Sequence, residues 1–304
     1  MKRKILSFVV LVALAANLLS CGSSTSQIST GKDVYILNFG DYMSEEAIDI
    51  FEKETGIRVH QDVFEANEEV IPVIESGTKY DVICISDYCI ERMIAKDLLM
   101  PLDKSKISNL HNINKEKYEM LSVCDPGNTY AVPYFCGSMG IFSNKNKLDA
   151  MGIRFPRTWA ELFNPALKGE LIMQSSIRDL YTVGLKKNGF SVNSTSEEEI
   201  NICTEDFIKQ KPYVQAYLTD QVKEKILSGE AAIAPITSGD VQYIYLEGGS
   251  DEYCFIVPEE GTQFFIDAWC ITKEAENVDN AYKFIDVGDA IKYYSDGYNR
   301  VRAS

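Results

Sequence analysis

Short apolar runs alternate with amphipathic stretches over the first third of the chain. The run at 81–85 is apolar almost throughout, which is typical of a strand buried on both faces. Ser44 before two glutamates predicts a helix start, and Gly56 predicts the end of that helix at a left-handed cap. This order of elements predicts a parallel sheet with helices on both faces. Strands are expected at 34–39, 57–63 and 81–85, and helices at 44–56 and 67–76.

The pattern changes over the rest of the chain, where two long extended segments frame a second set of elements. Residues 130–143 and 264–272 are both extended and apolar, and we expect them to pass between two α/β lobes. The predicted domains are lobe 1 at 33–135 and 265–304, and lobe 2 at 136–264. Further strands are expected at 171–173, 231–236 and 253–257, with helices from 158, at 179–188, from 196 and at 275–287.

The first residues have the pattern of an export signal. Three basic residues precede an apolar run that ends at Leu19, too short for a comfortable membrane span. The sequence LLSC at 18–21 resembles a bacterial lipobox, which predicts a lipoprotein signal peptide at 1–20 and lipid attachment at Cys21. Residues 21–32 are then a flexible polar tether. The alternative is an ordinary signal peptide with an incidental cysteine.

Charge and composition exclude several kinds of protein. The 304 residues are 45% apolar and 25% charged, which is typical of a globular chain. Acidic residues outnumber basic ones 45 to 30, so no nucleic-acid partner is expected. The chain has two histidines, an odd set of seven cysteines after Cys21, and no CxxC pair, so we predict no metal site and no cofactor. Four thiols lie in apolar runs and are expected to be buried, namely Cys84, Cys136, Cys254 and Cys270.

Aromatic, hydroxyl and isolated acidic residues follow the predicted strands, at the sheet edge where α/β proteins bind ligands. They lie at 38–42, at 86–88, at 174–176 with Asp179, at 237–239 and at 264–267. Aromatic rings cover methylene groups and attract ammonium groups, and carboxylates offset the cost of desolvating a cation. The set therefore favours a small organic cation with an aliphatic body. The alternative is that these are ordinary loop and core residues.

Several segments together resemble the spermidine/putrescine-binding proteins of bacterial ABC importers, which have the type II periplasmic binding fold. The resemblance extends from about residue 34 to about residue 300. It rests on EKETGIRV at 52–59, YDV at 80–82 with SDY at 86–88, DKSKISNL at 103–110, YAVPY at 130–134, TWAEL at 158–162 and IDA at 266–268.

The resemblance implies a role for each ligand-binding residue. Asp267 would pair with one amine of the ligand and Asp179 with the other, with Ser176 nearby. Phe39 and Phe265 would enclose the methylene chain. The family usually has tryptophan at these two aromatic positions and at Thr237, and an acid at Ser176. The remaining wall and hydrogen bonds would come from Tyr42, Ser86, Tyr88 and Tyr298.

The function implied is capture and delivery. A monomeric, lipid-anchored protein outside the cytoplasm would bind a polyamine between its lobes, close by a hinge at the crossover strands, and dock on a permease with its ATPase. No catalysis is expected. Alternatives are the same fold with thiamine or ferric iron as ligand, a polyamine sensor, and an exported cysteine hydrolase using His111 with Cys124 or Cys136.

Overall fold

The computed structural model describes residues 31–40, 42–246 and 251–286 of the chain. The predicted signal peptide at 1–20, Cys21, most of the tether at 21–32 and Tyr298 lie outside the described residues, as do residues 287–304 of lobe 1. Within the ranges that the structure describes, no helix has the length and apolar character needed to cross a membrane.

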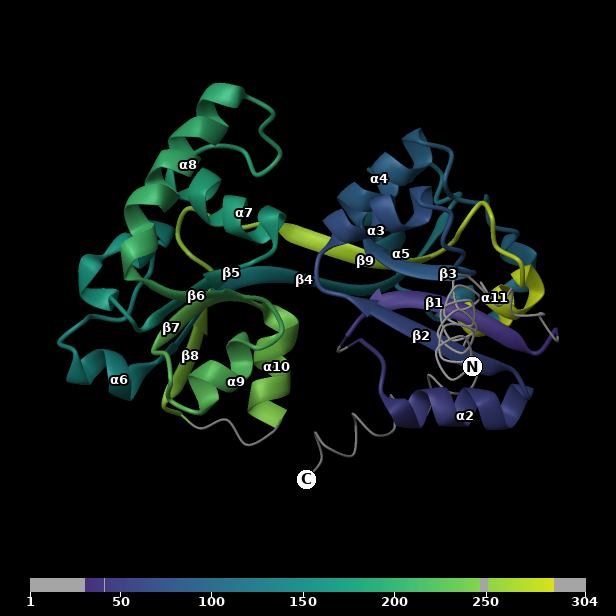
Figure 1. Ribbon diagram of the computed structural model, residues 1–304, viewed down its shortest axis with the longest axis horizontal. Coiled ribbons are helices and arrows are strands. Elements are labelled where there is room, and N and C mark those ends of the chain that lie inside the picture. The colour runs from purple at the N-terminus through teal and green to yellow at the C-terminus, as the bar shows by residue number, and fades with distance from the viewer. Residues whose placement is uncertain (1–30, 41, 247–250, 287–304) are drawn as a thin grey trace, which may run out of the picture. The chain divides into compact units, whose positions relative to one another are not determined.

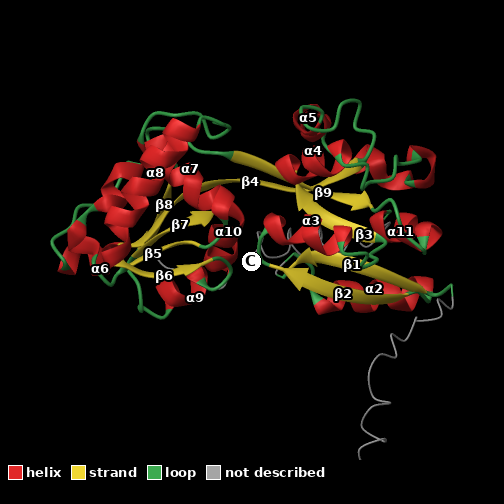
Figure 2. Ribbon diagram, turned by 45° about the horizontal axis from the view of Figure 1, so that its top comes forward, coloured by secondary structure: helices red, strands yellow, loops and turns green. Residues whose placement is uncertain are grey.

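The first three strands form the parallel sheet that the sequence predicts. β1 (Asp33–Phe39) lies between β2 (Arg58–Phe64) and β3 (Val82–Ser86) and runs parallel to both. Helices α2 (Glu45–Thr55) and α3 (Asn67–Glu75) connect these strands, and α2 lies on the opposite side of them from α3 (Figures 1 and 2).

The ends of α2 follow from its sequence. The Ser44 side chain accepts a hydrogen bond from the backbone N–H of Ala47, which satisfies one of the free donors of the first turn. Gly56 has φ of 68°, a conformation that costs glycine little because it has no Cβ. Its N–H donates to the carbonyl of Glu52 and closes the helix. The predicted bounds of α2 are therefore confirmed.

Two long strands connect this sheet to a second group of elements. β4 (Ala131–Asn144) pairs through residues 131–138 with β9 (Phe264–Ile271), and through residues 139–144 with β7 (Ile233–Thr237) and β8 (Tyr253–Ile256). All of these pairs are antiparallel, and β9 is also antiparallel to β3. The strands thus form one mixed sheet in the order β2-β1-β3-β9-β4-β7-β5-β6, with β8 beside β4 (Figure 1).

The second group repeats the strand-and-helix pattern. β5 (Leu171–Gln174) pairs in parallel with β6 (Val214–Leu218) and β7. The sequence did not predict β6, whose residues are half-exposed or exposed and lack a continuous apolar run. The helices of this group are α6 (Lys145–Ala150), α7 (Ile177–Lys187), α8 (Glu197–Gln210), α9 (Val222–Leu227) and α10 (Ser238–Leu246).

The buried residues form four clusters that divide into two pairs. Two clusters draw their buried members from 34–132 and 266–285, and two from 139–253. In β1 and β3, alternate side chains enter different clusters, as the period of two in a strand requires: Ile83 faces α3 and α4 (Asp87–Ala95), and Val82 faces α2 and α11 (Val278–Ile285). The domain boundaries at 135–136 and 264–265 stay a prediction.

Three sequence predictions need local correction. The helix expected from 158 is a short 3₁₀ helix, Trp159–Phe163, that begins with a capping box between Thr158 and Glu161. Cys136 is exposed rather than buried, because it lies where β4 passes between the two pairs of clusters, and Cys254 is half-buried rather than buried. Short helices that were not predicted lie at Lys104–Lys106, Ser108–Asn112, Lys115–Leu121 (α5), Pro165–Leu167 and Lys211–Tyr213.

Candidate functional site

Asp267 is a buried carboxylate where β3 ends and β9 begins. Ser86, the last residue of β3, is the direct antiparallel partner of Asp267, so the two side chains lie on the same face. The Ser86 hydroxyl and the Tyr42 hydroxyl each donate to Asp267 at 2.5 Å. The Asn67 amide donates to Ser86 Oγ at 2.9 Å and so directs the serine proton toward Asp267. Two neutral donors thus hold a carboxylate that is 1% exposed.

The environment of Asp267 favours its neutral form. Burial raises the pKa of Asp267 from 3.8 to about 6, even though the hydrogen bonds from Ser86 and Tyr42 lower it. The negative charges of Asp87 and Asp179 raise this pKa further. A cation beside Asp267 would reverse the effect, because it would stabilise the charged form.

Asp179 lies in the first turn of α7, where the helix dipole favours a negative charge. Ser176 is the N-cap, and its Oγ accepts from the Asp179 backbone N–H at 3.4 Å. The Gln263 amide donates to Asp179 Oδ1, and its carbonyl accepts from the Thr182 hydroxyl at 2.8 Å. Burial raises the pKa of Asp179, and the charge of Glu68 adds to this effect. The negative charge of Asp179 also raises the pKa of Asp267, so the two acids are close enough to interact electrostatically.

An aromatic wall extends from β1. The Phe39 ring contacts the rings of Tyr42 and Phe64, with centroids 4.7 and 4.4 Å apart. Tyr42 also contacts the ring of Phe135, which is 45% exposed, at 4.9 Å. Since Tyr42 donates to Asp267, this wall and the buried acid belong to one site.

Phe265 lies against the crossover strand β4. A Cβ at Gly137 would lie 2.8 Å from the Phe265 ring and 2.9 Å from Ser238 Oγ, so glycine is needed for this close approach. Gly137 is the ladder partner of Phe265. That Phe39 and Phe265 enclose a ligand from two sides stays a prediction.

Tyr88, in the first turn of α4, contacts the second group of elements. Its ring lies 5.4 Å from the guanidinium carbon of Arg178, a cation–π contact. Arg178 is held in place by hydrogen bonds to the Val192 carbonyl at 2.7 Å and to the Asn193 side chain at 2.6 Å. Burial raises the pKa of Tyr88, so its hydroxyl stays protonated and donates to Glu68 at 3.3 Å.

Thr237 ends β7 and donates its hydroxyl to Asp240 at 2.7 Å. Asp240 in turn pairs with the buried Lys223 of α9 at 3.6 Å. The charge of Asp240 also acts on Tyr42. Burial is the main cause that raises the pKa of Tyr42, the charge of Asp267 is the second, and the charge of Asp240 raises it further. Asp240 and Lys223 were missed in the sequence, although the three-residue spacing from Thr237 to Asp240 is a common helix-start pattern.

The structure thus joins Asp267, Tyr42 and Ser86 directly. The charge of Asp179 reaches Asp267, and Thr237 is connected to this group through its hydrogen bond to Asp240, whose charge reaches Tyr42. Gln263, Asn67 and Glu68 are further polar members that sequence reasoning missed. Their positions depend on contacts between distant segments, which no local pattern signals. The predicted Tyr298 contact lies outside the described residues.

Two of the alternatives would need a metal ion or a cysteine nucleophile. Within the residues described, no three histidine, cysteine, aspartate or glutamate side chains are grouped so that they could hold a metal ion. Burial raises the pKa of the Cys124 thiol to about 12, whereas a cysteine nucleophile requires a thiolate. His111 contacts the Ser108 carbonyl through Nδ1 at 2.9 Å, and none of the hydrogen bonds among the described residues joins it to Cys124 or Cys136.

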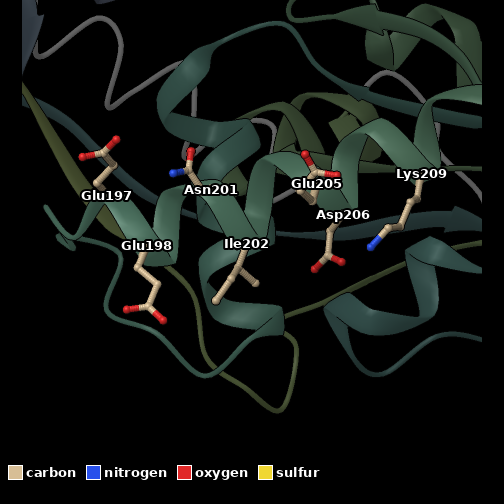
Figure 3. A pocket seen from close by; sticks show the side chains of 7 residues that line it. All are labelled: Glu197, Glu198, Asn201, Ile202, Glu205, Asp206 and Lys209. Carbon is tan, nitrogen blue, oxygen red and sulfur yellow. The ribbon is translucent and has the colours of Figure 1, made fainter.

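A separate hollow lies along α8, away from these residues (Figure 3). Every residue that lines it belongs to this one helix, so it is an open strip of helix surface. The lining residues are Glu197, Glu198, Asn201, Ile202, Glu205, Asp206 and Lys209. The acidic residues of α8 therefore form a solvated face of the helix.

Residues 46–287 match the model of a family described as bacterial extracellular solute-binding protein. The chain is 30% identical over 275 residues to the spermidine/putrescine-binding periplasmic protein of Salmonella typhimurium, covering 90% of this chain and 77% of that protein. It is 28% identical over 300 residues to the putrescine/cadaverine-binding protein of Pseudomonas aeruginosa, covering 94% of this chain and 80% of that protein.

Solved structures show the same arrangement. The PotD substrate-binding protein of a spermidine/putrescine ABC transporter from Streptococcus pneumoniae is 32% identical, with a TM-score of 0.64 over 84% of this chain and 77% of that one. A lipoprotein of Treponema pallidum is 26% identical, with a TM-score of 0.74 over 84% of this chain and 79% of that one. The predicted type II periplasmic binding fold is therefore confirmed, including the two crossover strands.

Proposed function

Because the chain belongs to the family of bacterial extracellular solute-binding proteins, we propose that it captures a polyamine outside the cytoplasm and delivers it to the permease of an ABC importer. Spermidine and putrescine are the ligands we expect, since the names of its relatives in Salmonella typhimurium and Pseudomonas aeruginosa refer to polyamines. The proposed activity is binding and transport, without catalysis.

The observation that carries this proposal is the buried, neutrally bonded Asp267. Its pKa of about 6 lies about two units above that of a free aspartate, which is equivalent to a cost on the order of 3 kcal/mol for ionising it at neutral pH. A ligand ammonium would supply the missing countercharge and recover that free energy. A neutral ligand could not supply this countercharge, so the site favours a cation.

The rest of the site suits a second ammonium at the far end of an aliphatic chain. Asp179 is also bonded by neutral groups, and burial raises its pKa too. In the proposed complex, Phe39 and Phe265 cover the methylene groups, while Tyr42, Ser86, Tyr88, Ser176, Thr237 and Tyr298 complete the wall. Rings in such a position exclude water and attract the ammonium ends.

We further propose that Cys21 is lipidated and that the protein acts as a monomer anchored to the membrane. The lipobox-like sequence at 18–21 and the tether at 21–32 support this. The name of the Treponema pallidum relative, a lipoprotein, supports it too. Labelling cells with a radioactive fatty acid tests the anchor: Cys21→Ser should remove the label and release the protein from the membrane.

Isothermal titration calorimetry of the purified protein with putrescine, spermidine and spermine tests the ligand. We expect binding of at least one amine, and loss of that binding in Asp267→Asn. Asp279→Asn is the matched control, because it removes the same charge from an exposed residue of α11 that pairs with Lys106 at the surface. Absence of heat with all three amines would refute the polyamine assignment, and heat with thiamine or ferric ion instead would replace it.

A further inference from the structure

Lys223 is a buried cation next to the proposed ligand site. It lies on α9, is 6% exposed, and its Nζ lies 3.6 Å from Asp240 Oδ1. Lysine is rarely buried to this extent unless its charge is paired, so the pair with Asp240 accounts for its position. Asp240 is bonded in turn to Thr237, a predicted ligand-binding residue.

Other contacts place this pair at the same site. The charge of Asp240 reaches Tyr42, which donates to Asp267. Asp220 precedes Lys223 by three residues, and its Oδ2 lies 3.4 Å from the position of a Cβ on Gly40, the residue that follows β1. The start of α9 therefore borders the end of β1, where the aromatic wall begins.

The acids of the site differ in how they are neutralised. Asp267 and Asp179 accept hydrogen bonds from neutral hydroxyl and amide groups, whereas Asp240 already has an ammonium beside it. A ligand ammonium at either of the first two acids would gain a countercharge. A third ammonium that approached Asp240 would meet the positive charge of Lys223 first and gain little.

We propose that Lys223 is a specificity-determining residue that takes the ammonium position at Asp240 and thereby favours ligands with two ammonium groups over ligands with three. This inference rests on the proposed function and deepens it by assigning a preference between diamines and triamines. Lys223 acts on selectivity through charge, and it need not touch the part of the ligand held by Asp267 and Asp179.

The test compares the dissociation constants of putrescine and spermidine by calorimetry in the wild type and in Lys223→Met. Methionine keeps an unbranched apolar stem of similar length and removes the charge. Without the lysine charge beside it, Asp240 should attract the third ammonium, so the affinity for spermidine relative to putrescine should rise about tenfold, as expected for one close charge pair of modest strength. Lys225→Met is the matched control on the same helix, since Lys225 pairs with Glu230 at the surface, and it should leave the ratio unchanged.

Two further variants keep the inference testable if Lys223→Met folds poorly. Asp240→Asn removes the acid that attracts an ammonium while it keeps the lysine charge, and it should lower the spermidine-to-putrescine affinity ratio below that of the wild type. The double variant Lys223→Met with Asp240→Asn should lose the gain of the single lysine variant, because the acid that attracts the third ammonium is gone.

The outcomes separate this inference from the proposed function. A wild type that binds neither amine overturns the proposed function and this inference with it. A wild type that binds polyamines, together with the same affinity ratio in Lys223→Met and in Asp240→Asn, overturns the role of Lys223 alone and leaves the proposed function standing.

Discussion

Replacing Asp267 with asparagine should stabilise the ligand-free protein at neutral pH while abolishing binding. The pKa of Asp267 is raised from 3.8 to about 6 in the folded protein, so the folded state binds this proton more tightly than the unfolded state does. The contribution of the protonated Asp267 carboxyl to stability is therefore fully present below about pH 4 and is lost as the pH rises through about 6. Asparagine has the same shape and no charge to desolvate.

The size of the effect follows from the shift. About two pKa units correspond to roughly 3 kcal/mol of stability that the wild type loses at pH 7. An asparagine amide accepts hydrogen bonds from Ser86 and Tyr42 less well than a carboxylate does, which takes back part of this gain. We therefore expect the variant to be more stable than the wild type by about 1–3 kcal/mol at pH 7. For a chain of this size that is a rise in melting temperature of roughly 2–10 °C. The gain should shrink as the pH falls from 7 to 4.5, where the wild-type carboxyl is protonated.

Thermal and urea denaturation of ligand-free protein at pH 7 and pH 4.5 measures this difference, with Asp279→Asn as the surface control. Polyamine binding in the same variant should weaken by about 100-fold or more, because the loss of one partner of a buried ion pair costs about 3–5 kcal/mol. A variant less stable than the wild type at pH 7, or a stability difference that does not change with pH, would contradict the assignment of Asp267 as a desolvated, ligand-neutralised acid.

Three further substitutions test particular contacts. Gly137→Ala should destabilise the protein by about 1–3 kcal/mol and weaken polyamine binding, because the new methyl group would displace the ring of Phe265; urea denaturation and calorimetry measure the two effects. Gly56→Ala should cost about 1 kcal/mol without changing affinity, since φ of 68° is unfavourable for alanine at this helix end, and an unchanged denaturation midpoint would argue against that conformation. Arg178→Met removes the cation–π contact with Tyr88 and should lower stability by about 0.5–2 kcal/mol; a double-mutant cycle with Tyr88→Leu that shows no coupling would refute the contact.

Local signals in the sequence predicted local structure well. Ser44 and Ser196 cap the helices they were expected to begin, since a cap depends only on the next three residues, whereas the cap at Ser176 was not predicted and its helix begins two residues before the expected 179. The parallel order of β1, β2 and β3 also followed from the sequence, because a helix between two strands leaves few ways to connect them. Pro72 lies within the predicted helix α3, in its second turn.

Long-range pairing was harder to predict. The antiparallel direction of β4 and β9 depends on partners far away in the chain, and their apolar pattern fits either direction. The resemblance to known binding proteins, rather than periodicity, placed Asp267 and Asp179 in one site. Ser86 meets Asp267 because the register of β3 and β9 sets them opposite each other, and Tyr42, 225 residues from Asp267, reaches the same carboxylate from the segment after β1. The Lys223–Asp240 pair was missed because each residue alone is an ordinary helix charge.

The pairing of β9 with both β3 and β4 bears on when the chain can fold during synthesis. Ala131 pairs with Cys270, and the cluster around Val34 and Phe51 is completed by Trp269 and Phe284, so the first core needs residues made more than a hundred positions later. A nascent chain that ends near residue 135 exposes half of that core and should remain sensitive to protease. Contacts of such wide sequence separation slow folding, so we expect this core to form only after Trp269 and Phe284 have been made.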